Sequence, residues 1–172
     1  MRILLAGLAL LVATNASPLY AKGGGRNKRA AATAADPNAA VAKAHGGKVW
    51  ILTSAPPSTE GDDLAKWLSS QPQAAEVTKK PHTERWAITY LAVFKKPPAR
   101  GPMTIEFVDK KDPKVLVAQD SSQIPGDGLV FYEPYDLEEN NGFNKGHTYI
   151  VKVGQILKRK FVTYATGQVT LK

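Results

Sequence analysis

The feature that most constrains this chain is a hydrophobic period of two, which begins at Lys48 and continues to the last residues. Its longest stretch is 85–95, where aromatic and aliphatic residues occupy alternate positions: Trp86, Ile88, Tyr90, Ala92 and Phe94. Alternation of this kind places apolar side chains on one face of a half-buried β-strand. Pro97 and Pro98 end the stretch, because proline cannot donate a hydrogen bond to a neighbouring strand.

Six further segments favour strands, and turn-forming residues separate them. They are residues 48–53, 102–108, 115–119, 129–133, 147–153 and 160–172. The turn at 109–113 predicts a hairpin between the second and third of these segments. The last segment is either one bent strand or a hairpin, because Gly167 allows a bulge near 165–167.

One segment has a helical period instead. Ser58 precedes two acidic residues that suit a first helical turn, and Leu64, Trp67 and Leu68 follow at helical spacing. Pro72 ends the pattern. The sequence therefore predicts an all-β fold, an antiparallel β-sandwich of seven to eight strands with one short inserted helix near residues 60–70.

Leu137 and the run 146–153 resemble the loop and penultimate strand of immunoglobulin-like and fibronectin type III-like sandwiches. The resemblance covers residues 48–172 at the level of the fold. It implies that the Tyr149 hydroxyl bonds to the preceding loop, as in a tyrosine corner, and that Trp86 is a core tryptophan. The chain departs from antibody domains because it has no cysteine pair and carries the inserted helix.

The first 21 residues predict a secretory signal peptide. Arg2 supplies the positive charge, and the apolar run 3–13 is shorter than the 20 or so residues that span a bilayer. Small residues permit cleavage after Ala16 or after Ala21, and Pro18 favours the second site. An uncleaved anchor is the alternative. We expect a periplasmic or secreted protein, and the absence of cysteine excludes a lipidated N-terminus.

Residues 22–47 predict a flexible tether, rich in alanine, glycine and basic residues, ahead of a domain at 48–172. The tether has five basic residues and one acidic residue, whereas the domain has 17 basic and 14 acidic residues. A domain so nearly balanced in charge disfavours nucleic acid as a partner. The tether's charge suits contact with an anionic surface, and a solvated linker without a partner is the alternative.

No motif in the sequence predicts catalytic or cofactor chemistry. The 172 residues contain no cysteine, and His45, His82 and His147 are too far apart for ligand spacing. There is no Gly-x-Ser-x-Gly motif and no phosphate-binding loop. We therefore expect no cofactor.

Two sets of residues remain as candidate sites. Asp136, Glu138 and Asn140 offer alternating oxygen ligands for calcium, although the segment is not an EF-hand and a solvated turn is the alternative. Tyr132 and Tyr135 flank Pro134, and we expect at least one of them to be exposed and to contact a ligand or partner, core packing of both being the alternative. The period turns Tyr132 away from the face of Phe131, and Pro134 is expected to end the strand and turn Tyr135 outward.

These observations predict an exported, non-enzymatic module that binds a protein or polysaccharide of the cell envelope or serves as a structural accessory domain. The alternative is a hydrolase of envelope polymers, which would need two carboxylates that only the fold can bring together.

Overall fold

The computed structural model describes residues 36–125 and 128–172, and it is mainly β. The elements are α1 (Ala39–His45), β1 (Lys48–Leu52), α2 (Gly61–Ser70), β2 (Ala74–Val77), β3 (Arg85–Val93), β4 (Pro102–Asp109), β5 (Leu116–Pro125), β6 (Val130–Glu138), the 3₁₀ turn η1 (Glu139–Asn141), β7 (Thr148–Leu157) and β8 (Lys160–Leu171). The predicted signal peptide and residues 22–35 of the predicted tether lie outside the described residues.

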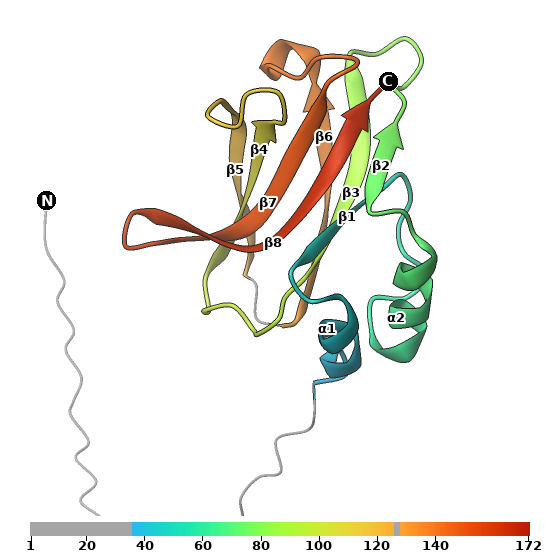
Figure 1. Ribbon diagram of the computed structural model, residues 1–172, viewed down its shortest axis with the longest axis vertical. Helices are drawn as coiled ribbons and strands as arrows, with labels where there is room; N and C mark the ends of the chain where they lie inside the picture. Colours follow the sequence, from blue (N-terminus) through green and yellow to red (C-terminus); the bar gives the residue numbers. More distant parts are fainter. Residues whose placement is uncertain (1–35, 126–127) are drawn as a thin grey trace, which may run out of the picture. The chain divides into compact units, whose positions relative to one another are not determined.

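The eight strands form one mixed sheet that curls into a half-barrel (Figure 1). Seven strands follow the order β5-β4-β7-β8-β1-β3-β6, and β2 pairs with β8. The pairs β1–β8 and β2–β8 are parallel, and the other pairs are antiparallel.

The predicted two-sheet, immunoglobulin-like sandwich is wrong, and β1 is the reason. This strand pairs with β3 along its whole length and also meets β8, where the Thr166 N–H donates to the Gly47 carbonyl at 3.1 Å. The close approach needs Gly167, because a Cβ at this position would collide with the Val49 carbonyl. The contact between β1 and β8 thereby joins the strands β5-β4-β7-β8 to the strands β1-β3-β6 in one sheet. The hydrophobic period alone does not show whether such groups form one sheet or two.

The predicted strands are present, and several run further than their apolar patterns. β5 and β6 extend beyond the predicted segments 115–119 and 129–133, and the short strand β2 was not predicted. β8 is a single strand opposite β7, and the pairing shifts register between Val153 and Gly154. Backbone pairing to a neighbour extends these strands, so their ends do not depend on alternating side chains.

The concave face of the sheet holds the larger core. It buries the aromatic residues Trp86, Tyr90, Phe94, Phe107, Phe131, Phe143 and Tyr149. Trp86 is fully buried, as the resemblance implied, and its Nε1–H donates to the Lys172 carbonyl at 3.0 Å. This bond ties β3 to the end of the chain.

The convex face of β1 and β3 packs against the two helices. α2 is confirmed near the predicted residues 60–70, and it buries Leu64 and Leu68. α1 lies within the segment predicted as tether, but Val41 is fully buried against α2, and the His45 Nε2 atom lies 3.0 Å from the Ala65 carbonyl oxygen. The folded domain thus begins before Lys48, because Val41 and His45 are among the residues that pack α1 against the rest of the domain.

Candidate functional site

β5 and β6 are the edge strands at the two ends of the seven-strand path, and their residues line the hollows described below. Along β6 the side chains alternate strictly: Phe131 and Leu137 are buried in the concave core, and Tyr132, Pro134 and Asp136 are exposed on the convex face. Because of this alternation, the two candidate tyrosines of β6, Tyr132 and Tyr135, lie on opposite faces of the sheet.

Tyr132 lies on the convex face, as the period predicted. Its side chain is 46% exposed, and its backbone pairs with Leu91 of β3. An exposed tyrosine offers an apolar face with a polar end, which suits contact with a ligand. The binding role of Tyr132 stays a prediction.

Tyr135 does not face outward, so that expectation is wrong. Its ring is half-buried in the concave face, where it stacks on Phe107 with the centroids 5.4 Å apart and meets Tyr90 edge-on at 6.5 Å. Burial raises the pKa of its hydroxyl. The physical reason is that Pro134 does not end the strand, because an edge strand tolerates a proline and β6 continues to Glu138.

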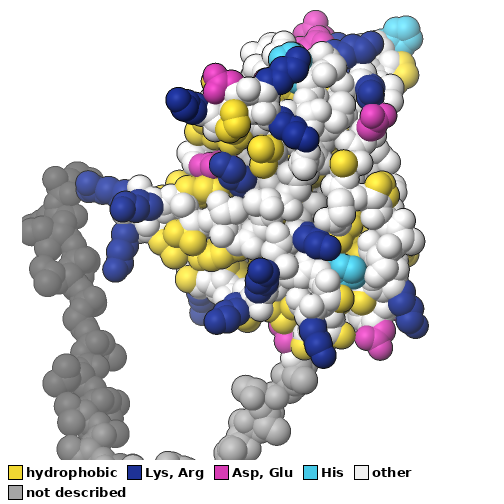
Figure 2. All heavy atoms as spheres, in the orientation of Figure 1, with side chains coloured by type: hydrophobic (Ala, Val, Ile, Leu, Met, Phe, Trp, Pro, Cys, Tyr) yellow, Lys and Arg dark blue, Asp and Glu magenta, His cyan; other side chains and the backbone are white. Residues whose placement is uncertain are grey.

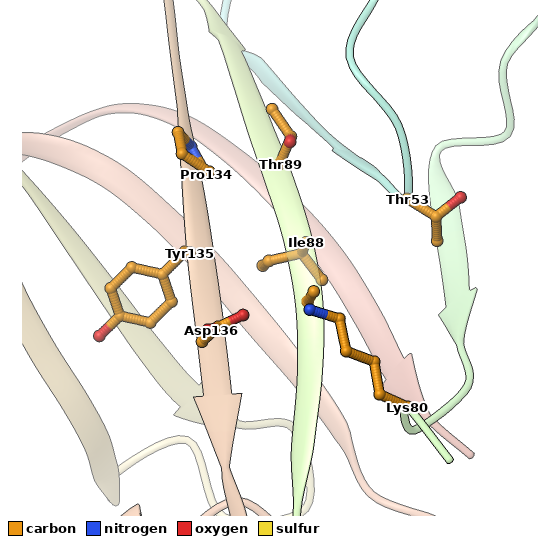
Figure 3. A pocket seen from close by; sticks show the side chains of 8 residues that line it. Thr53, Lys80, Ile88, Thr89, Pro134, Tyr135 and Asp136 are labelled. Carbon is orange, nitrogen blue, oxygen red and sulfur yellow. The ribbon is translucent and has the colours of Figure 1, made fainter. Parts of the chain in front are cut away.

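A groove of about 430 Å³ opens on the sheet where β3 and β6 run side by side (Figure 3). We call it the outer groove, and its lining residues are Thr53, Lys80, Ala87, Ile88, Thr89, Pro134, Tyr135 and Asp136. Figure 3 shows the Lys80 side chain extending over β3 toward β6. The groove thus combines a cation, a carboxylate and two threonine hydroxyls with a few apolar atoms.

A second hollow, of about 150 Å³, lies on the concave side between the two edge strands. We call it the mouth cavity, and it is lined by Tyr90, Ile105, Asp120, Ser121, Ser122, Glu133 and Tyr135. The Tyr90 hydroxyl donates to the Glu133 carboxylate at 2.7 Å. Burial raises the pKa of Tyr90 far above its usual value, and Glu133 adds to the effect, so that tyrosine stays a neutral donor.

Asp120 and Glu133 were not predicted as site residues. They come from different strands, and only the curl of the sheet brings them to one cavity. One local signal was present, because Glu133 shares the strand face of Phe131, where the period calls for an apolar residue.

The proposed calcium ligands do not form a loop. Asp136 and Glu138 are strand residues of β6, and Asn140 is in η1. Arg85 of β3 lies opposite, with its Nε 2.8 Å from Glu138 and its Nη1 3.8 Å from Asp136. In residues 36–125 and 128–172 no group of three or more histidine or acidic side chains could hold a metal. Calcium binding stays a prediction, and Arg85 already supplies a positive charge there.

Tyr149 behaves as the resemblance implied. Its ring is fully buried, and its hydroxyl accepts a hydrogen bond from the Asn144 backbone N–H at 2.6 Å. The residue ties β7 to the loop before it, and its role is structural.

Comparison with protein-family models gave no match, and comparison with curated proteins gave none either. Neither helix in the described part of the chain has the length and hydropathy that crossing a bilayer requires.

Proposed function

We propose that this chain is an exported, non-enzymatic module that binds a polysaccharide of the cell envelope in the outer groove, with Tyr132 beside it. Export rests on the predicted signal peptide. The single observation that carries the binding role is the composition of the groove, in which Lys80, Asp136, Thr53 and Thr89 surround a hollow of about 430 Å³. That volume is in the range of ligand-binding clefts.

The polar lining favours a ligand rich in hydroxyl groups. Thr53 and Thr89 both donate and accept hydrogen bonds, Lys80 donates and Asp136 accepts, so alternating hydroxyls of a sugar chain find partners of both kinds. Tyr132 and Pro134 are two residues apart on the same strand face, about 7 Å along the strand. A sugar ring that leaves the groove along β6 therefore meets the exposed tyrosine.

Strand addition by a protein partner is less well supported. β6 is an edge strand, but Pro134 stands at its middle and lacks the N–H that pairing would use. The edge is thus protected, and recognition falls to the side chains of the convex face.

The test is binding of envelope polysaccharide from the producing cell, measured by affinity electrophoresis or calorimetry. Tyr132→Ala should weaken binding about tenfold, and Asp136→Asn and Lys80→Met should weaken it as well. Val115→Ala is the matched control, because Val115 is also 46% exposed but lies beside β5. Equal binding by the tyrosine variant and the control contradicts the proposal.

The mouth cavity favours a second candidate function, hydrolysis of an envelope polymer. Asp120 and Glu133 line one cavity with the neutral donor Tyr90, and paired carboxylates are the groups that glycoside hydrolysis uses. Incubation with the same polysaccharides should then release reducing ends, and Glu133→Gln should abolish the release. If the wild-type protein releases no reducing ends, or if Glu133→Gln releases as many as the wild type, this candidate function is excluded.

A further inference from the structure

The hairpin of β7 and β8 extends beyond the rest of the sheet (Figure 1). The strands pair as far as Leu157 and Lys160, so only Lys158 and Arg159 form the turn. We call residues 155–162 the basic arm. The charge run Lys158-Arg159-Lys160 is visible in the sequence, but nothing was predicted from it.

The end of the basic arm carries three adjacent, exposed cations: Lys158, Arg159 and Lys160. None of them has an ion pair within the described ranges. The surrounding sequence offers no compensation, because residues 140–172 contain six lysines and arginines and no aspartate or glutamate. Figure 2 shows a group of Lys and Arg side chains where the arm ends, with hydrophobic side chains directly behind it.

The apolar residues behind the cations are exposed on both faces of the arm. Ile156 pairs with Phe161 on one face, and Leu157 and Val162 share the other. Ile156 is 50% exposed, Leu157 39% and Val162 37%. A groove on a partner protein would cover one face, whereas the headgroup region of a bilayer surrounds both.

The turn keeps its cations at a cost in stability. Lys158 has φ of 50° and Arg159 has φ of 65°, in the left-handed region that is unfavourable for residues with a side chain. A two-residue hairpin of this geometry favours Asn-Gly. Strained residues of this kind concentrate at functional sites.

We propose that the basic arm binds an anionic phospholipid surface. Lys158, Arg159 and Lys160 contact lipid phosphates, and Ile156, Leu157, Phe161 and Val162 lie at the boundary with the acyl chains. Long basic side chains reach the phosphates while their stems lie among apolar groups. This contact is separate from the outer groove, so it stands or falls independently of polysaccharide binding.

The experiment uses protein purified from the producing cell and sedimented with vesicles. One set contains phosphatidylglycerol mixed with phosphatidylcholine, and the other contains phosphatidylcholine alone. Binding should require the anionic lipid and fall steeply with salt. The double variant Lys158→Asn with Arg159→Gly should bind about 25-fold more weakly, at about fivefold for each of the two cations.

That double variant suits the turn better than the native residues, so its melting temperature should not fall and lost binding cannot be ascribed to unfolding. Lys110→Ser with Lys111→Ser is the matched control, because it removes two exposed cations from the β4–β5 turn. The affinity of this control variant for anionic vesicles should fall less than fivefold. The variant Ile156→Ser with Leu157→Ser should also bind more weakly, which a purely ionic contact would not show.

Three results would each overturn the proposal. The first is equal binding to both sets of vesicles, or binding to neither. The second is an equal loss in the arm variant and the control. The third is binding to a soluble acidic polysaccharide that matches binding to vesicles while Ile156→Ser with Leu157→Ser binds as the wild type does, since that identifies a polyanion rather than a bilayer.

Discussion

Two hairpin turns of this molecule have similar basic and apolar residues, but only one of them also contains acidic residues. The turn between β4 and β5 carries three lysines followed by two exposed apolar residues: Lys110, Lys111, Lys114, Val115 and Leu116. The basic arm carries two exposed apolar residues followed by three cations: Ile156, Leu157, Lys158, Arg159 and Lys160. The difference lies in the acids between them.

In the β4–β5 turn, two aspartates build the structure. The Asp109 Oδ1 atom accepts from the Lys111 N–H at 2.8 Å, and Asp112 Oδ1 accepts from the Lys114 N–H at 3.2 Å. Asp109 also pairs with His147 at 2.8 Å. The carboxylates shape this turn and offset its charge, whereas the basic arm has neither. A basic turn without interleaved acids leaves its whole charge available to a partner.

The largest expected effect concerns the base of the basic arm. A Cβ at Gly154 would collide with the Val162 carbonyl across the pair, so Gly154→Ala should lower the free energy of unfolding by about 3 kcal/mol. Chemical denaturation measures it. Gly128→Ala is the control, because its Cβ would make an ordinary contact at 3.9 Å. Equal stability of the two variants would show that the arm does not depend on this close approach.

The next effect concerns the opposite end of β7, where Tyr149 pairs with Asp109 beside the β4–β5 turn. Tyr149→Phe leaves the Asn144 N–H without its acceptor, and it should cost about 1–3 kcal/mol in thermal or chemical unfolding. Tyr132→Phe, at an exposed position, should cost little. A Tyr149→Phe melt unchanged within error contradicts the structural role of this hydroxyl.

A smaller and opposite effect is expected at the end of the arm. Lys158→Asn with Arg159→Gly relieves the left-handed strain and should raise the free energy of unfolding by about 1 kcal/mol. The same replacement at Lys110 and Lys111 should not, because the structure assigns neither residue a positive φ. Two equal changes in stability would remove the distinction between the turns.

The smallest effect is the pH dependence of the β4–β5 turn. The hydrogen bond with His147 holds the pKa of the Asp109 carboxyl below its usual value, with the Lys111 N–H adding to the effect. A lowered pKa stabilises the fold above the ordinary aspartate value of about 4, and the stabilisation is lost as the pH falls through the lowered value. Melting temperatures between about pH 3 and pH 6 should fall less steeply with acid in Asp109→Asn than in the wild type. Parallel curves for the two proteins would mean that the pair contributes nothing.

The mouth cavity and the outer groove show how far sequence patterns reach at a candidate site. The period of two placed Tyr132 on the exposed face, because the direction of a strand side chain depends only on its neighbours. The same reasoning failed for Tyr135, since it took Pro134 as the end of the strand. The sequence around Tyr135 does not predict its contact with the Phe107 ring. Likewise, the sequence around Asp120 and Glu133 does not predict that both line one cavity.

The sequence by itself determined every strand except β2, the helix near residues 60–70 and the burial of Trp86 and Tyr149, because each follows from a local period or a short motif. Only the tertiary structure decided that the strands form one curled sheet, that α1 belongs to the domain and that the basic arm projects beyond the sheet. These outcomes depend on contacts between distant segments, such as Gly47 with Thr166 and Val41 with α2. The alternating pattern of a strand predicts which of its faces is apolar, but it does not predict which strand will pair with it.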